Sequence, residues 1–161
     1  KEGTYFKGPA IVFESEKSML DSLYNNNIKE GMVIIIRNQG PKGGIGMPEL
    51  LKPSSELISF NLSSKTALLT DGRWSGGSSG FLIGHITPEA YEGGLLAIVE
   101  DGDTIQIDAE NKEINLCIDP SEIDKRLSNW KKPKPNYTRG VLAKYAHTVS
   151  SASLGAITDN F

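Results

Sequence analysis

Two glycine-dense segments carry the polar side chains whose types and spacing could do chemistry. The first, residues 40–46, reads Gly-Pro-Lys-Gly-Gly-Ile-Gly and is followed three residues later by Glu49. The second, residues 71–80, contains Ser75, then two glycines, then Ser78. Glycine admits positive φ and lets a ligand approach the main chain closely, and successive free N–H groups form a concavity that attracts anions. These first and second glycine loops together favour a binding or catalytic site over tight turns alone.

Neither glycine loop matches a common nucleotide or nucleophile motif. No Gly-Lys-Ser/Thr follows at the spacing of a P-loop, and neither segment opens a long helix with Gly-x-Gly-x-x-Gly. Around Ser75 the order Gly-Arg-Trp-Ser-Gly is one residue too long for the Gly-x-Ser-x-Gly nucleophile elbow. The two histidines, His85 and His147, are distant from Ser75 in the sequence. A Ser–His–acid triad therefore stays open, without local support.

The elements before each loop must position it. Residues 10–13 predict a strand, and the helix after it has Ser15 as its expected N-cap and apolar residues at helical spacing. The unbroken apolar run 32–37 predicts a strand covered on both faces, directly before the first glycine loop. A short helix is expected to begin at Pro48, because proline is favoured in a first helical turn. Residues 66–69 predict the strand before the second glycine loop.

The later part of the chain is richer in strands than in helices. Turn-forming residues separate three predicted strands, and two predicted helices follow on either side of a Pro/Lys-rich linker. The strands are 95–99, 104–107 and 114–118, the helices are 121–127 and 139–149, and the linker is 131–135. The sequence thus predicts a mixed α/β domain centred on a β-barrel or sandwich, with a few short flanking helices.

Composition narrows the class of protein. A chain of 161 residues with 38% hydrophobic and 23% charged residues fits one globular domain. Its net charge of −3 argues against a nucleic-acid surface, and we expect neither a membrane segment nor a signal peptide. Cys117, the single cysteine, is expected to be a buried or half-buried strand residue. One thiol cannot hold an iron–sulfur cluster or a structural zinc, and it suggests a reducing compartment.

The glycine loops and three further segments resemble a known family. Residues 40–49 and 70–78 resemble the two signature segments in the C-terminal half of the dihydroxy-acid and sugar-acid dehydratases. Residues 84–90, with Asp-Gly-Asp at 101–103, are similar to the next segment of that family. Residues 149–156 resemble the tail of its branched-chain amino-acid member. The resemblance covers nearly the whole chain in order, and Ser79, where a bulkier residue is common, bears on the details of the substrate pocket.

The resemblance implies a fold, a reaction and residue roles. The fold would be the swivelling β/β/α type. Members remove water from a 2,3-dihydroxy acid to give a 2-keto acid, using an iron–sulfur cluster and Mg²⁺, and the branched-chain member would act on 2,3-dihydroxy-3-methyl acids in valine and isoleucine biosynthesis. Ser75 matches the serine that, as an alkoxide, takes the C2 proton. Gly77 and Ser78 match residues that contact substrate, and Glu49 matches a magnesium ligand. The roles require the Ser75 hydroxyl and Glu49 to share a cleft.

Each of these residues also has a plainer interpretation. Glu49 could favour the dipole of a helix start, and Ser75 could be a turn hydroxyl that bonds its own backbone. Arg73 is either a substrate or partner contact or half of a surface salt bridge. Asp71 is expected to be a turn or capping residue rather than a catalytic acid. We expect His85 to be a structural, hydrogen-bonded residue.

The same resemblance predicts that 1–161 is the single C-terminal domain of a larger dehydratase. The cluster cysteines and most magnesium ligands of the family lie in an N-terminal domain, so we expect no cofactor and no turnover in the isolated chain. Its expected partners are that N-terminal cluster-binding domain, a small dihydroxy acid and a second copy in a homodimer, without nucleic acid or membrane. The compartment would be the cytoplasm, or an organelle in a eukaryote. The alternatives are a domain of a sugar-acid dehydratase acting on 6-phosphogluconate or a pentonate, and a stand-alone anion-binding module.

Overall fold

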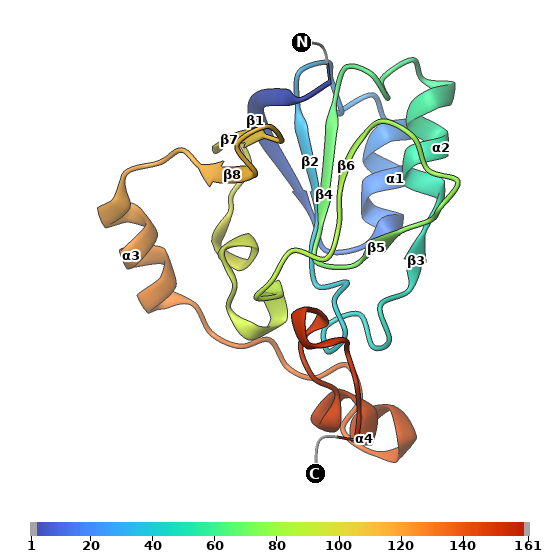
Figure 1. Ribbon diagram of the computed structural model, residues 1–161, viewed down its shortest axis with the longest axis vertical. Coiled ribbons are helices and arrows are strands. Elements are labelled where there is room, and N and C mark those ends of the chain that lie inside the picture. Colours follow the sequence, from blue (N-terminus) through green and yellow to red (C-terminus); the bar gives the residue numbers. More distant parts are fainter. Residues whose placement is uncertain (1–2, 160–161) are drawn as a thin grey trace.

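A computed structural model describes residues 3–159 and shows a mixed α/β domain built on one six-stranded sheet (Figure 1). The strand order is β6-β4-β2-β1-β7-β8. The first four of these strands are parallel to one another, and β7 is antiparallel to both β1 and β8. These strands are β1 (Tyr5–Phe13), β2 (Val33–Ile36), β4 (Ala67–Thr70), β6 (Phe81–Ile83), β7 (Thr104–Asp108) and β8 (Glu113–Leu116). A separate two-stranded ribbon pairs β3 (Glu49–Leu50) with β5 (Arg73–Trp74).

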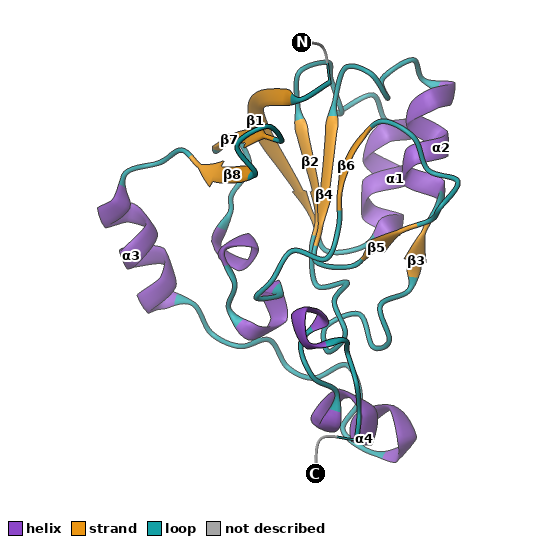
Figure 2. Ribbon diagram, in the orientation of Figure 1, coloured by secondary structure: helices purple, strands orange, loops and turns teal. Residues whose placement is uncertain are grey.

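Residues 3–159 also form four α-helices and three short 3₁₀ helices (Figure 2). The α-helices are α1 (Glu16–Tyr24), α2 (Lys52–Ser59), α3 (Pro120–Asn129) and α4 (Gly140–Thr148). Helices α1 and α2 cover one face of the sheet, whereas α3 and α4 lie away from it (Figure 2). The 3₁₀ helices are η1 (Ala90–Glu92), η2 (Leu95–Ile98) and η3 (Ala152–Leu154). In the part of the chain that is described, no helix has the length and apolarity needed to cross a membrane.

The core has two layers, one on each face of β2 and β4. Helices α1 and α2 lie side by side over one face, where Met19 and Leu57 pack against Ile34 (Figure 1). Over the other face, Leu96 of η2 packs with Ile35. All four residues of β2 are buried, so the predicted strand covered on both faces is confirmed.

Strand β1 joins the parallel and antiparallel parts of the sheet and gives it its curl. Residues 10–13 pair with β2, whereas residues 5–9 pair with β7. The curl brings the Phe6 ring within 5.9 Å of the ring of Phe81 on the far strand β6. The mixed α/β class is therefore confirmed. The described sheet is a curled half-barrel that ends at β6 and β8, rather than a closed barrel or a sandwich.

Most predicted elements are present, and the Ser15 N-cap is confirmed by its side chain, which accepts a hydrogen bond from the Ser18 N–H. The helix expected at Pro48 is wrong. Residues 49–50 form strand β3 because they pair with β5, and the helix begins only at Lys52 with Pro53 in its first turn. The half-buried place predicted for Cys117 is also wrong, because it follows the edge strand β8 and is exposed.

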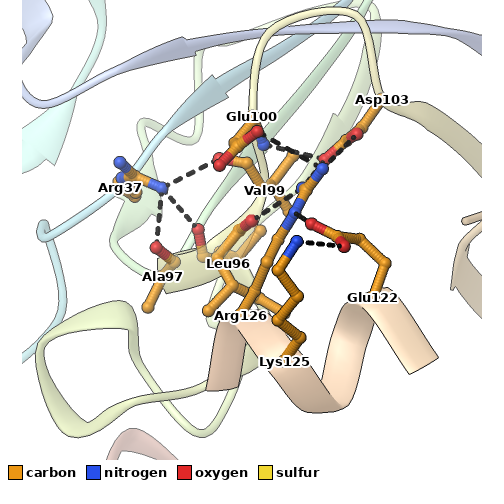
Figure 3. Close-up of polar contacts among 10 residues, drawn as sticks. Arg37, Leu96, Ala97, Val99, Glu100, Asp103, Glu122, Lys125 and Arg126 are labelled. Carbon is orange, nitrogen blue, oxygen red and sulfur yellow. Dashed lines mark hydrogen bonds and ion pairs between the residues drawn. The ribbon is translucent and has the colours of Figure 1, made fainter. Parts of the chain in front are cut away.

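The strand predicted at 95–99 is wrong as well, because two arginines hold that segment in a tight turn (Figure 3). The Arg37 guanidinium donates to the carbonyls of Leu96, Ala97 and Val99 at 3.0–3.1 Å. From another side, Arg126 donates to the Ile98 carbonyl at 3.1 Å and pairs with Asp103. Carbonyls that all accept from one guanidinium cannot also pair with neighbouring strands, because the carbonyls of a strand point alternately to its two sides.

Candidate active site

The ribbon of β3 and β5 brings the two glycine loops together. Glu49 aligns with Arg73 in parallel register, Leu50 aligns with Trp74, and the Ser75 N–H donates to the Leu50 carbonyl at 3.0 Å. Side chains alternate between the faces of a strand, and aligned residues of neighbouring strands share a face. Leu50 and Trp74 belong to the core beneath α1 and α2. By this alternation, the exposed Glu49 and the half-buried Ser75, one residue beyond β5, are expected on the side of the ribbon opposite this core.

Arg73 ties the second glycine loop to the chain just before Glu49. Its Nε donates to the Met47 carbonyl at 2.9 Å, while the residue as a whole remains exposed. Among the residues described, no salt bridge includes this guanidinium. The surface salt bridge considered for Arg73 is thus replaced by a contact that holds the two loops in register.

Ser75 sits at a turn whose following residues are open to solvent. Its Oγ accepts a long hydrogen bond, 3.4 Å, from the Gly77 N–H, and the Ser78 N–H donates to the Ser75 carbonyl at 3.0 Å. A Cβ added to Gly76 would meet no atom within 4 Å, and neither Gly76 nor Gly77 has a left-handed φ. The Ser78 Oγ is buried without a hydrogen-bond partner in the described part of the chain. Nothing in the described residues requires glycine at 76 or 77, and without side chains there a ligand can approach the main chain of this loop closely.

Unlike the second glycine loop, the first is already occupied, because a carboxylate of the protein itself binds to its N–H groups. The N–H groups of Lys42 and Gly43 donate to the Glu89 carboxylate at 3.1 and 2.9 Å, and the Gly44 N–H donates to the Gly40 carbonyl at 2.8 Å. The predicted anion-binding concavity therefore forms at this loop, and Glu89 fills it. This occupancy argues against the loop as a receptor for a free anion.

Asp71 is a buried organiser of the loops. It has no exposed surface and accepts hydrogen bonds from the N–H groups of Asn38 at 3.1 Å, Gln39 at 2.8 Å and Ala90 at 2.8 Å. Burial raises the pKa of this carboxyl, and the backbone donors offset part of that rise. The expectation of a capping residue rather than a catalytic acid is confirmed by these backbone partners.

Glu89 was not identified from the sequence. It is 4% exposed, and burial, followed by the charges of Asp71 and Glu92, raises its pKa against the effect of its two N–H donors. The one signal for it in the sequence is its place between Pro88 and Ala90 in a segment that resembles the dehydratases. Its partners are backbone groups more than forty residues away, which no local pattern can reveal.

His85 is structural through its backbone and not through its ring. Its N–H donates to the Gly72 carbonyl at 2.8 Å, and its φ is 57°. The side chain is exposed, and none of the hydrogen bonds among residues 3–159 includes its imidazole. The expectation of a structural, hydrogen-bonded residue is therefore confirmed for the backbone of His85, while the ring is exposed beside the second glycine loop.

The described residues fit the implied cofactors only in part. Within residues 3–159, no group of three or more His, Cys, Asp or Glu side chains is placed to hold a metal ion. Glu49 is one exposed carboxylate, a hard oxygen donor that suits Mg²⁺, so it fits as a single ligand to an ion completed by groups from elsewhere. Cys117 is a single thiol beyond the edge strand, so the described residues do not fit an iron–sulfur cluster.

Comparisons with known proteins identify the family to which the chain belongs. The family model for the dihydroxy-acid/6-phosphogluconate dehydratase C-terminal domain matches residues 1–156. The chain is 57% identical to a dihydroxy-acid dehydratase of Vesicomyosocius okutanii over 159 residues and 55% identical to that of Methylococcus capsulatus over 160. It is 55% identical to the mitochondrial dihydroxy-acid dehydratase of Saccharomyces cerevisiae over 161 residues. These matches cover 99% of this chain but only 28–29% of each relative, so the chain spans less than a third of their length. It belongs to the dihydroxy-acid/6-phosphogluconate dehydratase C-terminal family.

Proposed function

We propose that this chain is the C-terminal domain of a dihydroxy-acid dehydratase and supplies its catalytic base, Ser75. The observation that carries the proposal is the β3–β5 ribbon, whose alternation is expected to put Glu49 and Ser75 on the side opposite the core. The full-length enzyme would be a hydro-lyase of branched-chain amino-acid biosynthesis. It would remove a proton from C2 and hydroxide from C3 of a 2,3-dihydroxy-3-methyl acid, and the resulting enol would become a 2-keto acid.

Ser75 would act as an alkoxide that accepts the C2 proton. An alkoxide becomes accessible only where dipoles and cations stabilise its charge. The Gly77 N–H already points at the Ser75 Oγ, although at 3.4 Å the contact is weak in this state. A shorter approach of this N–H to the charged oxygen would favour the deprotonated form. How the hydroxyl first loses its proton is a separate step, to which the described residues assign no acceptor.

Gly77 and Ser78 would form the substrate-facing wall. Without a Cβ at Gly76 and Gly77, a substrate can approach the main chain of the loop closely. The Ser78 hydroxyl is buried and lacks a partner among the described residues, so it would donate to a substrate oxygen only after the loop shifts to expose it. Glu49 would provide one carboxylate ligand to Mg²⁺, which, when bound, supplies positive charge for the carboxylate and 2-hydroxyl of the substrate.

The remaining parts of the proposed enzyme would come from a preceding domain. Relatives are more than three times as long as this chain, which leaves room for an N-terminal domain that carries an iron–sulfur cluster. Exposed apolar side chains on α4 and the tail support a docking surface there: Val141, Leu142, Leu154 and Ile157. Of these residues, Leu142 adjoins the first glycine loop, because it lines one pocket together with Gly43 and Gly44. The swivelling β/β/α fold, a homodimer and a cytoplasmic or organellar location belong to the same proposal.

The test uses the full-length protein with 2,3-dihydroxyisovalerate and gluconate as competing substrates. We expect keto-acid formation from the branched substrate, and Ser75→Ala should lower kcat by about a thousandfold or more, in the range that a positioned base contributes. Ser64→Ala, at an exposed serine after α2, is the matched control and should keep wild-type kcat. Full activity of Ser75→Ala would eliminate Ser75 as the base, and a preference for gluconate would assign the chain to a sugar-acid dehydratase.

A further inference from the structure

Two buried carboxylates lie beneath the candidate site without a basic partner. Asp71 is fully buried and Glu89 is 4% exposed, and neither takes part in an ion pair within residues 3–159. A buried charge is costly unless hydrogen bonds compensate it. Here the compensation comes entirely from backbone N–H groups, three to Asp71 and two to Glu89. The carboxylates are therefore attached to main chain rather than to mobile side chains.

These hydrogen bonds join three segments at one point. Asp71, at the end of β4, holds residues 38–39 at the entrance of the first glycine loop. Through the Ala90 N–H it also holds the start of η1, directly beside Glu89. Glu89 then holds the middle of the first glycine loop at Lys42 and Gly43. Moving any one of the three segments would break a hydrogen bond to a buried carboxylate.

Both proposed functional residues lie a few positions beyond these attachments. The chain runs from Asp71 through Arg73 to Ser75, and from Gly43 through Met47 to Glu49. The ribbon that contains Glu49, and that Ser75 directly follows, has only two residues in each strand. Two-stranded ribbons are at best marginally stable by themselves. The position of Glu49 relative to Ser75 must therefore depend on how the two glycine loops are held where they begin.

Glu89 packs against the first glycine loop closely enough to fix the distance between that loop and η1. A Cβ added to Gly40 would lie 2.5 Å from the Glu89 Oε2 and 2.9 Å from its Cβ. The carboxylate therefore rests directly on the main chain of the first glycine loop, and only glycine leaves room for it.

We propose that Glu89, together with Asp71, is a positioning residue that sets the Glu49 loop against the Ser75 loop for the dehydration. The inference rests on the proposed function and adds to it the residues that hold the reacting groups in register. Displacing a catalytic group by about 1 Å can cost about a hundredfold in rate, so the effect should appear in kcat rather than in substrate affinity.

The decisive variant is Glu89→Gln in the full-length protein, with two measurements. We expect amide hydrogen exchange at Lys42 or Gly43, whichever faces the new NH₂ group, to accelerate by roughly tenfold or more, because that group cannot accept a hydrogen bond. We also expect kcat per folded enzyme to fall by about a hundredfold while KM changes by less than about threefold. Glu92→Gln is the matched control, since Glu92 is on the same turn but contacts only the side chains of Lys42 and Lys132.

Each outcome separates the possibilities. Faster exchange with unchanged kcat would make Glu89 purely structural and overturn the inference, and so would unchanged exchange. If Glu89→Gln fails to fold, Glu89→Asp keeps the charge but withdraws it by one methylene. It should then show faster exchange at the same two amides and a kcat about tenfold lower, and wild-type values for both would overturn the inference. Because the exchange measurement needs no turnover, failure of Ser75→Ala to lose activity would refute the proposed base without affecting this result.

Discussion

The two glycine loops have similar compositions, yet the surroundings of their glycines differ. In the first loop, Gly40 and Gly44 are packed against Glu89 and Gln39 so tightly that a methyl group has no room. In the second, an added Cβ at Gly76 would meet no atom within 4 Å, and one at Gly77 would have the Ser75 Oγ at 4.0 Å, which is ordinary contact. Packing within the fold requires glycine in the first loop, whereas no contact among the described residues requires it at Gly76 or Gly77. A glycine-rich sequence therefore does not by itself identify the surface that binds.

The largest effect on stability is expected in the first loop, from Gly44→Ala. An added Cβ would lie 2.6–2.7 Å from backbone atoms of Gln39, which cannot move aside as a side chain could. We expect the free energy of unfolding to fall by about 1–3 kcal/mol, as for overpacked sites. Chemical denaturation of this chain measures it. A variant as stable as wild type would mean that the first loop is as open as the second.

The matching change in the second loop, Gly76→Ala, should have the reverse outcome. With no atom within 4 Å of the added Cβ, the free energy of unfolding should change by less than about 0.5 kcal/mol. In the full-length enzyme, the methyl group would stand where substrate approaches, and kcat/KM should fall by roughly tenfold or more. Denaturation curves and kinetic assays of the same variant test this prediction. An unchanged kcat/KM would contradict it.

A smaller effect concerns pH and the carboxylate inside the first loop. The folded state raises the pKa of Glu89 above its usual 4.5, so the folded protein binds a proton more tightly than the unfolded chain does. Stability from this group is thus gained as pH falls from neutral through the raised pKa, and lost as pH rises. Glutamine cannot take up that proton. The stability advantage of wild type over Glu89→Gln should therefore widen between pH 7 and pH 5, and denaturation curves at both values would show it. A gap that narrows would contradict the raised pKa.

The last and weakest of these contacts is an exposed one near the first glycine loop. Lys132, in the Pro/Lys linker, pairs with Glu92 and stands 4.9 Å above the centre of the Tyr91 ring. Because this lysine is half exposed, solvent screens the pair, and Lys132→Ala should cost only about 0–1 kcal/mol. Thermal unfolding at low and high salt would measure it. A loss equal to that of Gly44→Ala would show that the linker, and not the buried packing, holds the first loop.

The sequence predicted the central strands and the first helix well, because their signals are local. The apolar run of β2 and the Ser15 cap of α1 depend on neighbours within a few residues. The apolar segment 95–99 predicts a strand, but hydrogen bonds from Arg37 to its carbonyls hold it in a 3₁₀ turn instead. Local patterns cannot anticipate such an override.

The site was only partly accessible for the same reason. The family resemblance identified Ser75 and Glu49 as candidates, but the ribbon that joins them has too few residues for any periodicity to appear. Glu89 was missed because its role comes from backbone groups distant in sequence. Buried carboxylates that bind main chain leave almost no trace in a sequence, although they decide which loops lie together.

The bent first strand has a consequence for how the domain is made. Because β1 pairs with β2 through residues 10–13 and with β7 through residues 5–9, the opening residues of the domain find their last partner only at 104–108. Contacts so far apart in sequence slow folding, since a long loop must close before they form. On a ribosome, the half of β1 that faces β7 would stay unpaired until most of the domain had emerged. Chaperone binding or misassociation during synthesis should therefore concentrate on those opening residues.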